Sequence, residues 1–159
     1  MSTIGSNTNA TIGYAKQVLA DIEDASMCEQ PLGLNHPAWL LTHLATAADY
    51  AAKLLGGEGV CPASWNDLAD TKKPLSQKRA DYPSKEELIN TFQAAYKNAA
   101  DLYEQSSDEA LSKSQKLGFF EKELPTVGDM ATFLIVSHAN LHLGQLSAWR
   151  RATGKAPLF

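Results

Sequence analysis

The hydrophobic residues of this chain recur every three or four positions in four separate stretches, as in helices that bury one face. The first stretch predicts a helix from about Thr8 to Ser26, and Thr8, Asn9 or Thr11 can cap its start. Its apolar face consists of Ile12, Ala15, Leu19 and Ile22. The pattern therefore begins with an amphipathic helix close to the N-terminus.

The second predicted helix begins near Pro37, because proline suits the first helical position, and Asn35 or His36 can cap it. It ends at Gly56 and Gly57, since glycine readily terminates a helix. Its apolar stripe consists of Leu40, Leu44, Ala47, Ala51 and Leu54.

A long connection, from Gly57 to Pro83, separates the second helix from the third. Connections of this length inside a compact domain are usually functional or span a distance. The length allows the second and third helices to run parallel, with the connection crossing the bundle. The segment SWNDLAD within it can form a short helical turn.

The third helix starts at a capping box formed by Ser84 and Glu87. Its apolar face consists of Leu88, Phe92, Ala95, Tyr96, Ala99 and Tyr103. A polar stretch from Gln105 to Lys116 follows and leads into the segment GFFEKELPT. This stretch predicts a connection rather than a further long helix.

The fourth helix starts at Thr126, with Asp129 as its capping-box partner, and Gly154 followed by Pro157 ends it. It runs through Met130, Leu134, His138, Leu141, His142, Gln145 and Trp149. No β-hairpin signal and no internal repeat accompanies these helices. We therefore expect an all-α fold, a four-helix bundle, with residues 1–159 as a single domain.

Composition narrows the function classes. The formal net charge of −4 argues against nonspecific nucleic-acid binding, and the small basic group Arg150, Arg151 and Lys155 suits the end of a helix. No apolar run reaches the ~18 residues of a membrane helix, and the N-terminus lacks signal-peptide features. We therefore expect a cytoplasmic protein, in which Cys28 and Cys61 are free thiols.

Two histidines at helical spacing are the strongest chemical signal. His138 and His142 lie four positions apart, so they share one helix face and can bind one metal ion. Four histidines in a chain of this length produce that spacing by chance in roughly 7% of random arrangements. The pair alone therefore does not establish a metal site, and a third ligand is needed to support one. His43 supplies one, because it falls within the apolar stripe of the second helix. Three imidazoles leave an open coordination position, as in catalytic metal sites.

Other prominent residues have simpler interpretations. A lone histidine on an apolar face is more often a hydrogen-bonded core residue than a ligand. His36 lies at a helix boundary, where a cap or surface role is favoured over a proton shuttle at the rim of the pocket. Trp39 suits the core, and Tyr96, Tyr103 and Trp149 either pack there or line a cavity. No residue stands out as a general acid or base, so the catalytic residues stay unassigned.

The four helices, the segment from Trp39 to Leu44 and the segment from His138 to Gln145 resemble the DinB/YfiT-like superfamily. The resemblance covers nearly the whole chain. It implies a four-helix bundle that binds a divalent metal, most often zinc or nickel, through three histidines, here His43, His138 and His142. It also implies homodimers and, in members of known activity, thiol S-transfer or isomerisation with low-molecular-weight thiols such as bacillithiol or mycothiol.

These observations predict a metal-dependent enzyme that acts on a small molecule. The reaction is either transfer of a thiol to an electrophile or hydrolysis, and the family resemblance favours thiol transfer. The alternative is a non-catalytic protein that binds a metal or ligand, or a dimeric interaction module.

Overall fold

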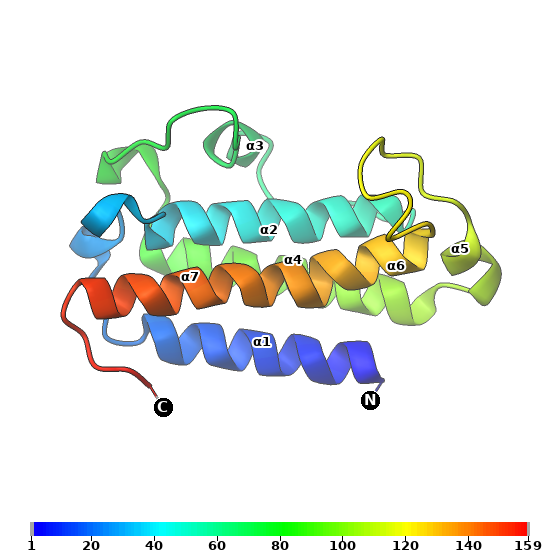
Figure 1. The fold of residues 1–159 in the computed structure, drawn as a ribbon, viewed down its shortest axis with the longest axis horizontal. Coiled ribbons are helices and arrows are strands. Elements are labelled where there is room, and N and C mark those ends of the chain that lie inside the picture. Colours follow the sequence, from blue (N-terminus) through cyan, green and yellow to red (C-terminus); the bar gives the residue numbers. More distant parts are fainter. Residues whose placement is uncertain (1, 159) are drawn as a thin grey trace.

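Four long helices lie side by side in the computed structural model, which describes residues 2–158 (Figure 1). They are α1 (Thr3–Leu19), α2 (Pro37–Leu54), α4 (Lys85–Gln105) and a composite last helix. The last helix consists of α6 (Val127–Thr132), the π-helical segment η4 (Phe133–His138) and α7 (Ala139–Ala152). The short elements are η1 (Asp24–Ser26), η2 (Pro31–Gly33), α3 (Trp65–Leu68), η3 (Arg79–Asp81) and α5 (Asp108–Ser112). Residues 2–158 contain no strand, so the predicted all-α bundle is confirmed.

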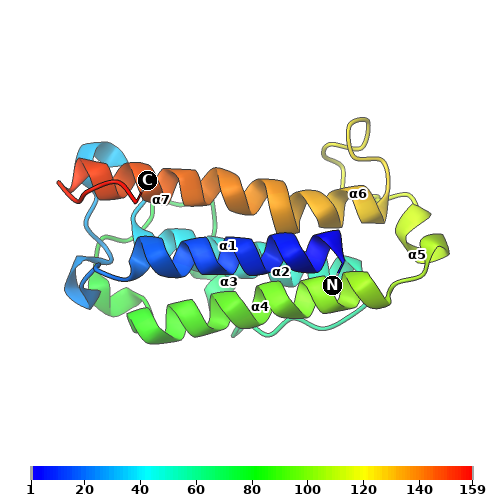
Figure 2. The same cartoon turned by 90° about the horizontal axis from the view of Figure 1, so that it is seen from below.

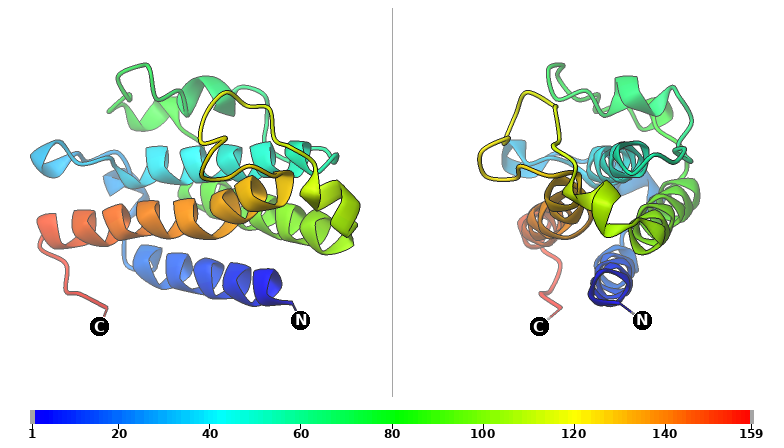
Figure 3. Two further views of the ribbon diagram at one scale, coloured as in Figure 1. Left: turned by 45° about the vertical axis from the view of Figure 1, so that its right-hand side comes forward. Right: turned by 90° about the vertical axis from the view of Figure 1, so that its right-hand side faces the viewer.

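The helices α2 and α4 run in the same direction, and α1 and α7 run the opposite way (Figures 1 and 2). Because α2 and α4 are parallel, the chain between them must return along the bundle. It does so across the outer side of α2 and carries α3 with it (Figure 3). The predicted crossover connection is therefore confirmed. None of the helices among residues 2–158 is long and apolar enough to cross a membrane.

The predicted N-caps of the last three long helices are present, although among residues 2–158 the expected capping box at Ser84 and Glu87 forms only its Ser84 half. The backbone N–H of Glu87 donates to the Ser84 hydroxyl (3.2 Å), and Thr126 and Asp129 form a reciprocal capping box. At the start of α2, the backbone N–H of Trp39 donates to Nδ1 of His36 (3.1 Å). Local hydrogen bonds thus fix where these helices begin.

The predicted bounds of the first helix, Thr8 to Ser26, were wrong. The helix begins at Thr3, because the backbone N–H of Gly5 donates to the hydroxyl of Ser2 (3.1 Å). The proposed caps Thr8 and Thr11 instead lie buried inside it. Its end comes at Leu19, earlier than expected.

The core is packed most closely between α2 and α4, where small residues let two backbones approach. The buried alanines are Ala38, Ala45, Ala48, Ala51 and Ala52 on α2 and Ala95, Ala99 and Ala100 on α4. Larger side chains complete the core, including Trp149, whose indole N–H donates to the backbone carbonyl of Glu29 (2.6 Å). Leu141 is an exception to the predicted pattern, because 63% of it is exposed.

Candidate metal centre

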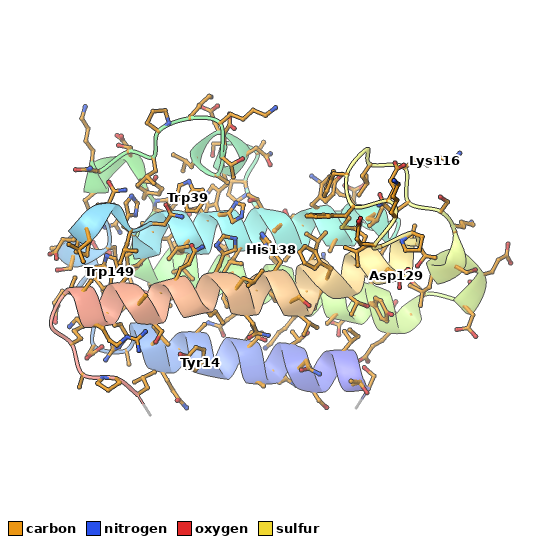
Figure 4. The ribbon with its side chains drawn as sticks, viewed as in Figure 1. Tyr14, Trp39, Lys116, Asp129, His138 and Trp149 are labelled. Carbon is orange, nitrogen blue, oxygen red and sulfur yellow. The ribbon has the colours of Figure 1, made fainter. Side chains whose placement is uncertain are left out.

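The three predicted histidines meet between α2 and the last helix. Nε2 of His138 lies 3.2 Å from Nε2 of His43 and 3.1 Å from Nε2 of His142. One ligand atom from each ring lies within 4.8 Å of the others. Figure 4 shows His138 projecting from the last helix toward α2, which carries Trp39. Residues 95 positions apart thus form one cluster that can hold a metal ion.

The spacing of the nitrogens suits a tetrahedral ion. Two nitrogens, each ~2.0–2.1 Å from zinc at a tetrahedral angle, are about 3.3–3.4 Å apart. The two Nε2 separations of 3.1 and 3.2 Å are close to this value. The donor set, three imidazole nitrogens, is also one that zinc, nickel and other late first-row ions accept.

Hydrogen bonding alone explains the cluster poorly. Nδ1 of His142 donates to Oε1 of Gln145 (3.1 Å), and the amide of Asn35 donates to the same oxygen (3.4 Å). In a neutral ring this leaves Nε2 of His142 as a lone pair. A proton on Nε2 of His138 can then serve the contact to His142 or the contact to His43, but not both well. A cation at the centre would satisfy all three nitrogens together.

Neighbouring groups orient the rings of His43 and His142. Trp39 stacks on His43, with ring centroids 4.8 Å apart and planes within 5°, and the backbone of Ala69 hydrogen-bonds the same imidazole. The side-chain amide of Gln145 bonds Nδ1 of His142, the nitrogen that does not contact His138. By contrast, Nδ1 of His138 is buried without a hydrogen-bond partner among the described residues. Such outer contacts set which nitrogen faces a metal.

The electrostatics keep the rings neutral. Burial, reinforced by the neighbouring histidines, lowers the pKa of both His43 and His138 to about 4. Burial also lowers the pKa of His142, although the hydrogen bond to Gln145 opposes this. At neutral pH the imidazoles are therefore uncharged, which is the form that ligates metals.

A π-helical turn shapes the surroundings of His138. In a regular α-helix, residues five apart differ by about 140° around the axis. The wider turn of η4 brings Phe133 onto the side of His138, and their ring centroids are 6.0 Å apart. This turn therefore adds an aromatic wall next to the histidines.

A pocket of about 840 Å³ opens beside His43 and His138. Two irregular segments rise on the same side of the bundle and flank it, the α2–α4 connection and the α5–α6 loop (Figure 1). Its aromatic lining residues are Tyr50, Phe119, Phe120 and Phe133. Polar residues of the connection, including Asp70, complete the lining. The arrangement provides an open face where a small molecule can approach the histidine cluster.

His36 lies outside this cluster. It is fully buried, and Nε2 donates to the backbone carbonyl of Ser76 (2.8 Å) while Nδ1 accepts from Trp39. Its role as the cap of α2 is confirmed. A surface position is excluded, and a proton shuttle is disfavoured because both nitrogens are engaged.

The remaining candidates are structural. Tyr96 and Trp149 are fully buried, and Tyr103 lines a separate pocket, where its hydroxyl bonds Thr132 (3.2 Å). Cys28 and Cys61 are free thiols, and burial raises the pKa of each, which disfavours the reactive thiolate.

Sequence reasoning missed the residues that surround the histidines. The sequence pattern marks Gln145 only as a position of the fourth helix, and it assigns no role to Asp70, Phe119 or Phe120. Two adjacent phenylalanines in an otherwise polar stretch were the available signal, because such residues rarely stay exposed without a reason.

A family model described as the DinB superfamily matches residues 8–146, which confirms the expected resemblance. The matched range includes all three histidines of the cluster. Comparison with curated proteins and with solved structures found no match.

Proposed function

The chain belongs to the DinB superfamily, and from this premise we propose that it is a metal-dependent enzyme acting on a small molecule. His43, His138 and His142 would hold one divalent ion, zinc or nickel, in the bundle. The observation that carries the proposal is the convergence of three neutral Nε2 atoms beside an open pocket.

A bound ion of this kind lowers the pKa of a water molecule toward ~7 or keeps a thiol as thiolate. The chain's own residues would keep the imidazoles neutral and oriented, through burial, the stacked ring of Trp39 and the amide of Gln145. The aromatic pocket would hold the substrate against the open side of the site. The reaction is therefore proposed as thiol transfer to an electrophile or as hydrolysis.

Metal content tests this proposal directly. Protein purified without chelator should retain close to one equivalent of zinc or nickel, measured by elemental analysis. His142→Ala should abolish retention and leave the helical circular dichroism signal intact, because this ring is only partly buried. Asn140→Ala is the matched control, since Asn140 is an exposed residue on the same helix. Less than about a tenth of an equivalent, with no recovery on adding Zn²⁺, Ni²⁺, Fe²⁺ or Mn²⁺, would end the metalloenzyme interpretation.

A non-catalytic metal-binding module is the second candidate. It is favoured by the lack of any carboxylate hydrogen-bonded to the three rings among residues 2–158. Turnover of a panel of electrophiles with several thiols, and of a panel of esters, separates the two functions. Activity that disappears with the metal supports the enzyme, whereas metal retention without turnover supports the module.

A homodimer is also proposed, on the family resemblance alone. Light scattering coupled to size-exclusion chromatography should give twice the chain mass of 17.2 kDa. A particle of one chain mass would exclude the dimer without affecting the metal proposal.

A further inference from the structure

We infer that Phe119 and Phe120 determine substrate specificity: their rings bind the aromatic or apolar body of the substrate while its reacting group lies at the histidines. The inference rests on the proposed function and deepens it, because it names the substrate class of the same site. It concerns the apolar side of the pocket, and it applies to thiol transfer and to hydrolysis alike.

The large apolar side chains of the pocket gather on one wall. Three of the five phenylalanines in the chain line the pocket, Phe119 and Phe120 from the α5–α6 loop and Phe133 from η4. The α2–α4 connection contributes polar side chains instead, among them Asp70 and Thr71. The loop and the connection rise from the bundle as separate arms (Figures 1 and 3). A molecule in the pocket therefore meets aromatic rings from one arm and hydrogen-bonding groups from the other.

The rings form a continuous row that leads to the histidines. The centroids of Phe119 and Phe120, and those of Phe120 and Phe133, are each 5.8 Å apart, and the centroid of Phe133 is 6.0 Å from that of His138. Each spacing is within the range of ~4.5–7 Å at which aromatic rings interact. A ligand ring beside Phe120 therefore lies two ring spacings from His138, and a short substituent on that ring reaches the histidine cluster.

The tip of the loop is held in place by a buried polar residue. Gln115 is only 2% exposed, and its amide N–H donates to the backbone carbonyl of Phe119 (3.0 Å). Its amide oxygen accepts the backbone N–H of Leu117 (3.0 Å). The carbonyl of Phe120 accepts the backbone N–H of Leu124 (2.7 Å). These bonds fix the backbone that carries both rings, so a ligand that binds them has less chain to order.

The fold alone does not account for a phenylalanine at position 120. Its φ is 52°, in the left-handed region that residues with a side chain rarely adopt, and 52% of the residue is exposed. Phe119 is 45% exposed. A glycine would accept this backbone without strain and would expose no ring. Strain of this kind gathers at ligand sites, and a ligand that covers the two rings removes apolar surface from water.

The substrate class follows from this wall. A small polar substrate would leave both phenylalanine rings in water and gain nothing from them. A substrate with a ring or a bulky alkyl group, joined by a short linker to its electrophilic or hydrolysable group, would contact the wall and the histidines together. We therefore expect the physiological substrate to be of the second kind.

Three uncharged probes test the inference: 3-phenylpropan-1-ol, 3-cyclohexylpropan-1-ol and propan-1-ol. They share a hydroxyl group and a linker and differ only in the apolar body. Each is titrated into the ¹⁵N-labelled full chain, both as purified and after chelator treatment, and amide shifts give the affinity and the place of binding. We expect the two ring-bearing probes to bind at least about tenfold more tightly than propan-1-ol in both states, because apolar burial needs no ion. The largest shifts should fall in residues 117–121 and at Phe133.

Variants assign the preference to its source. Phe120→Gly should bring the ring-bearing probes within about twofold of propan-1-ol, and Phe119→Ala should weaken them about threefold. Leu32→Gly is the matched control, because Leu32 also has a left-handed backbone (φ 55°) and is 90% exposed but does not line the pocket. It should preserve the preference. Glycine suits the backbone at both positions, so thermal melts of the two glycine variants should stay close to wild type.

Equal binding of the three probes, largest shifts outside the aromatic row, or a preference that survives Phe120→Gly would overturn the inference. If Phe120→Gly unfolds the chain, Phe119→Ala decides, and unchanged probe binding in that variant overturns it as well. Failure of the inference is distinguishable from failure of the proposed function. A chain that retains its metal but shows no preference for an apolar body refutes only the substrate class. A chain that shows the preference but retains no metal refutes only the metalloenzyme.

Discussion

Replacing Gln145 by alanine isolates the contribution of one outer contact to metal affinity. Oε1 of Gln145 accepts a hydrogen bond from the Nδ1–H of His142 (3.1 Å). The lone pair of the neutral ring is therefore on Nε2, the nitrogen that faces His138. Without the amide, the proton can move to Nε2 and the ring can rotate. Both changes oppose metal binding, although none of the three histidines is substituted.

The exposure of Gln145 determines how much metal affinity the substitution should remove. Removing an outer partner of a metal-bound histidine lowers affinity by about 10-fold to 100-fold. Gln145 is exposed, so water can replace part of its hydrogen bond, and we expect the lower end, near 10-fold or about 1.4 kcal/mol. Because the residue is exposed and its second hydrogen bond, from the amide of Asn35, is long (3.4 Å), the unfolding transition should move little.

Competition with a chromophoric chelator for Zn²⁺ measures the affinity of wild type and variant. Asn140→Ala is the control, because the Asn140 amide bonds the Val136 carbonyl of its own helix (2.9 Å) and none of the three histidines among residues 2–158. Gln145→Glu keeps an oxygen that can accept from Nδ1 of His142, so this variant should bind Zn²⁺ about as tightly as wild type. Unchanged affinity in Gln145→Ala, or an equal loss in Asn140→Ala, would show that the amide does not orient His142.

Two further predictions concern the parts of the fold that position the site. Asp49 is buried and accepts the backbone N–H groups of Val60 (2.9 Å) and Cys61 (2.8 Å), so Asp49→Ala should lower the free energy of unfolding by roughly 3 kcal/mol in urea denaturation. The hydrogen bond from Arg79 holds the pKa of Asp24 below its ordinary 3.8. The stabilisation contributed by ionised Asp24 is therefore present above pH 3.8, and it is lost as the pH falls through the lower pKa that Asp24 has in the folded chain. Asp24→Asn should destabilise by about 1 kcal/mol at pH 7, because the carboxylate is half exposed, and the difference from wild type in thermal melts should shrink toward pH 3. A difference that is constant with pH would contradict this role.

Local signals predicted the last three long helices well. Capping side chains such as Ser84 and Thr126 bond backbone groups three residues away, so their pattern is visible in a short segment. The first helix was misplaced because serine, threonine and asparagine are abundant near its start, and several of them looked like caps. Only packing distinguishes Ser2, which caps, from Thr8, which is buried.

The histidine cluster could also be anticipated from local rules. Helical periodicity places His138 and His142 on one face, and an apolar stripe turns His43 inward. The contacts that orient these rings could not be anticipated in this way, because Ala69 comes from the crossing connection and Gln145 is an exposed residue. Their roles depend on where the connection and the helix face happen to lie.

The pocket wall was the least predictable part because it depends on a change of helical register. The segment FLIVSH has the composition of an ordinary helix, and a regular helix would turn Phe133 about 140° away from His138. The π turn brings the two together, and the α5–α6 loop then places Phe120 against Phe133. No short pattern in the sequence records a register change of this kind. The sequence therefore points to the ligands of a metal, whereas the chemistry of the molecule brought to it depends on a wall that only the folded chain assembles.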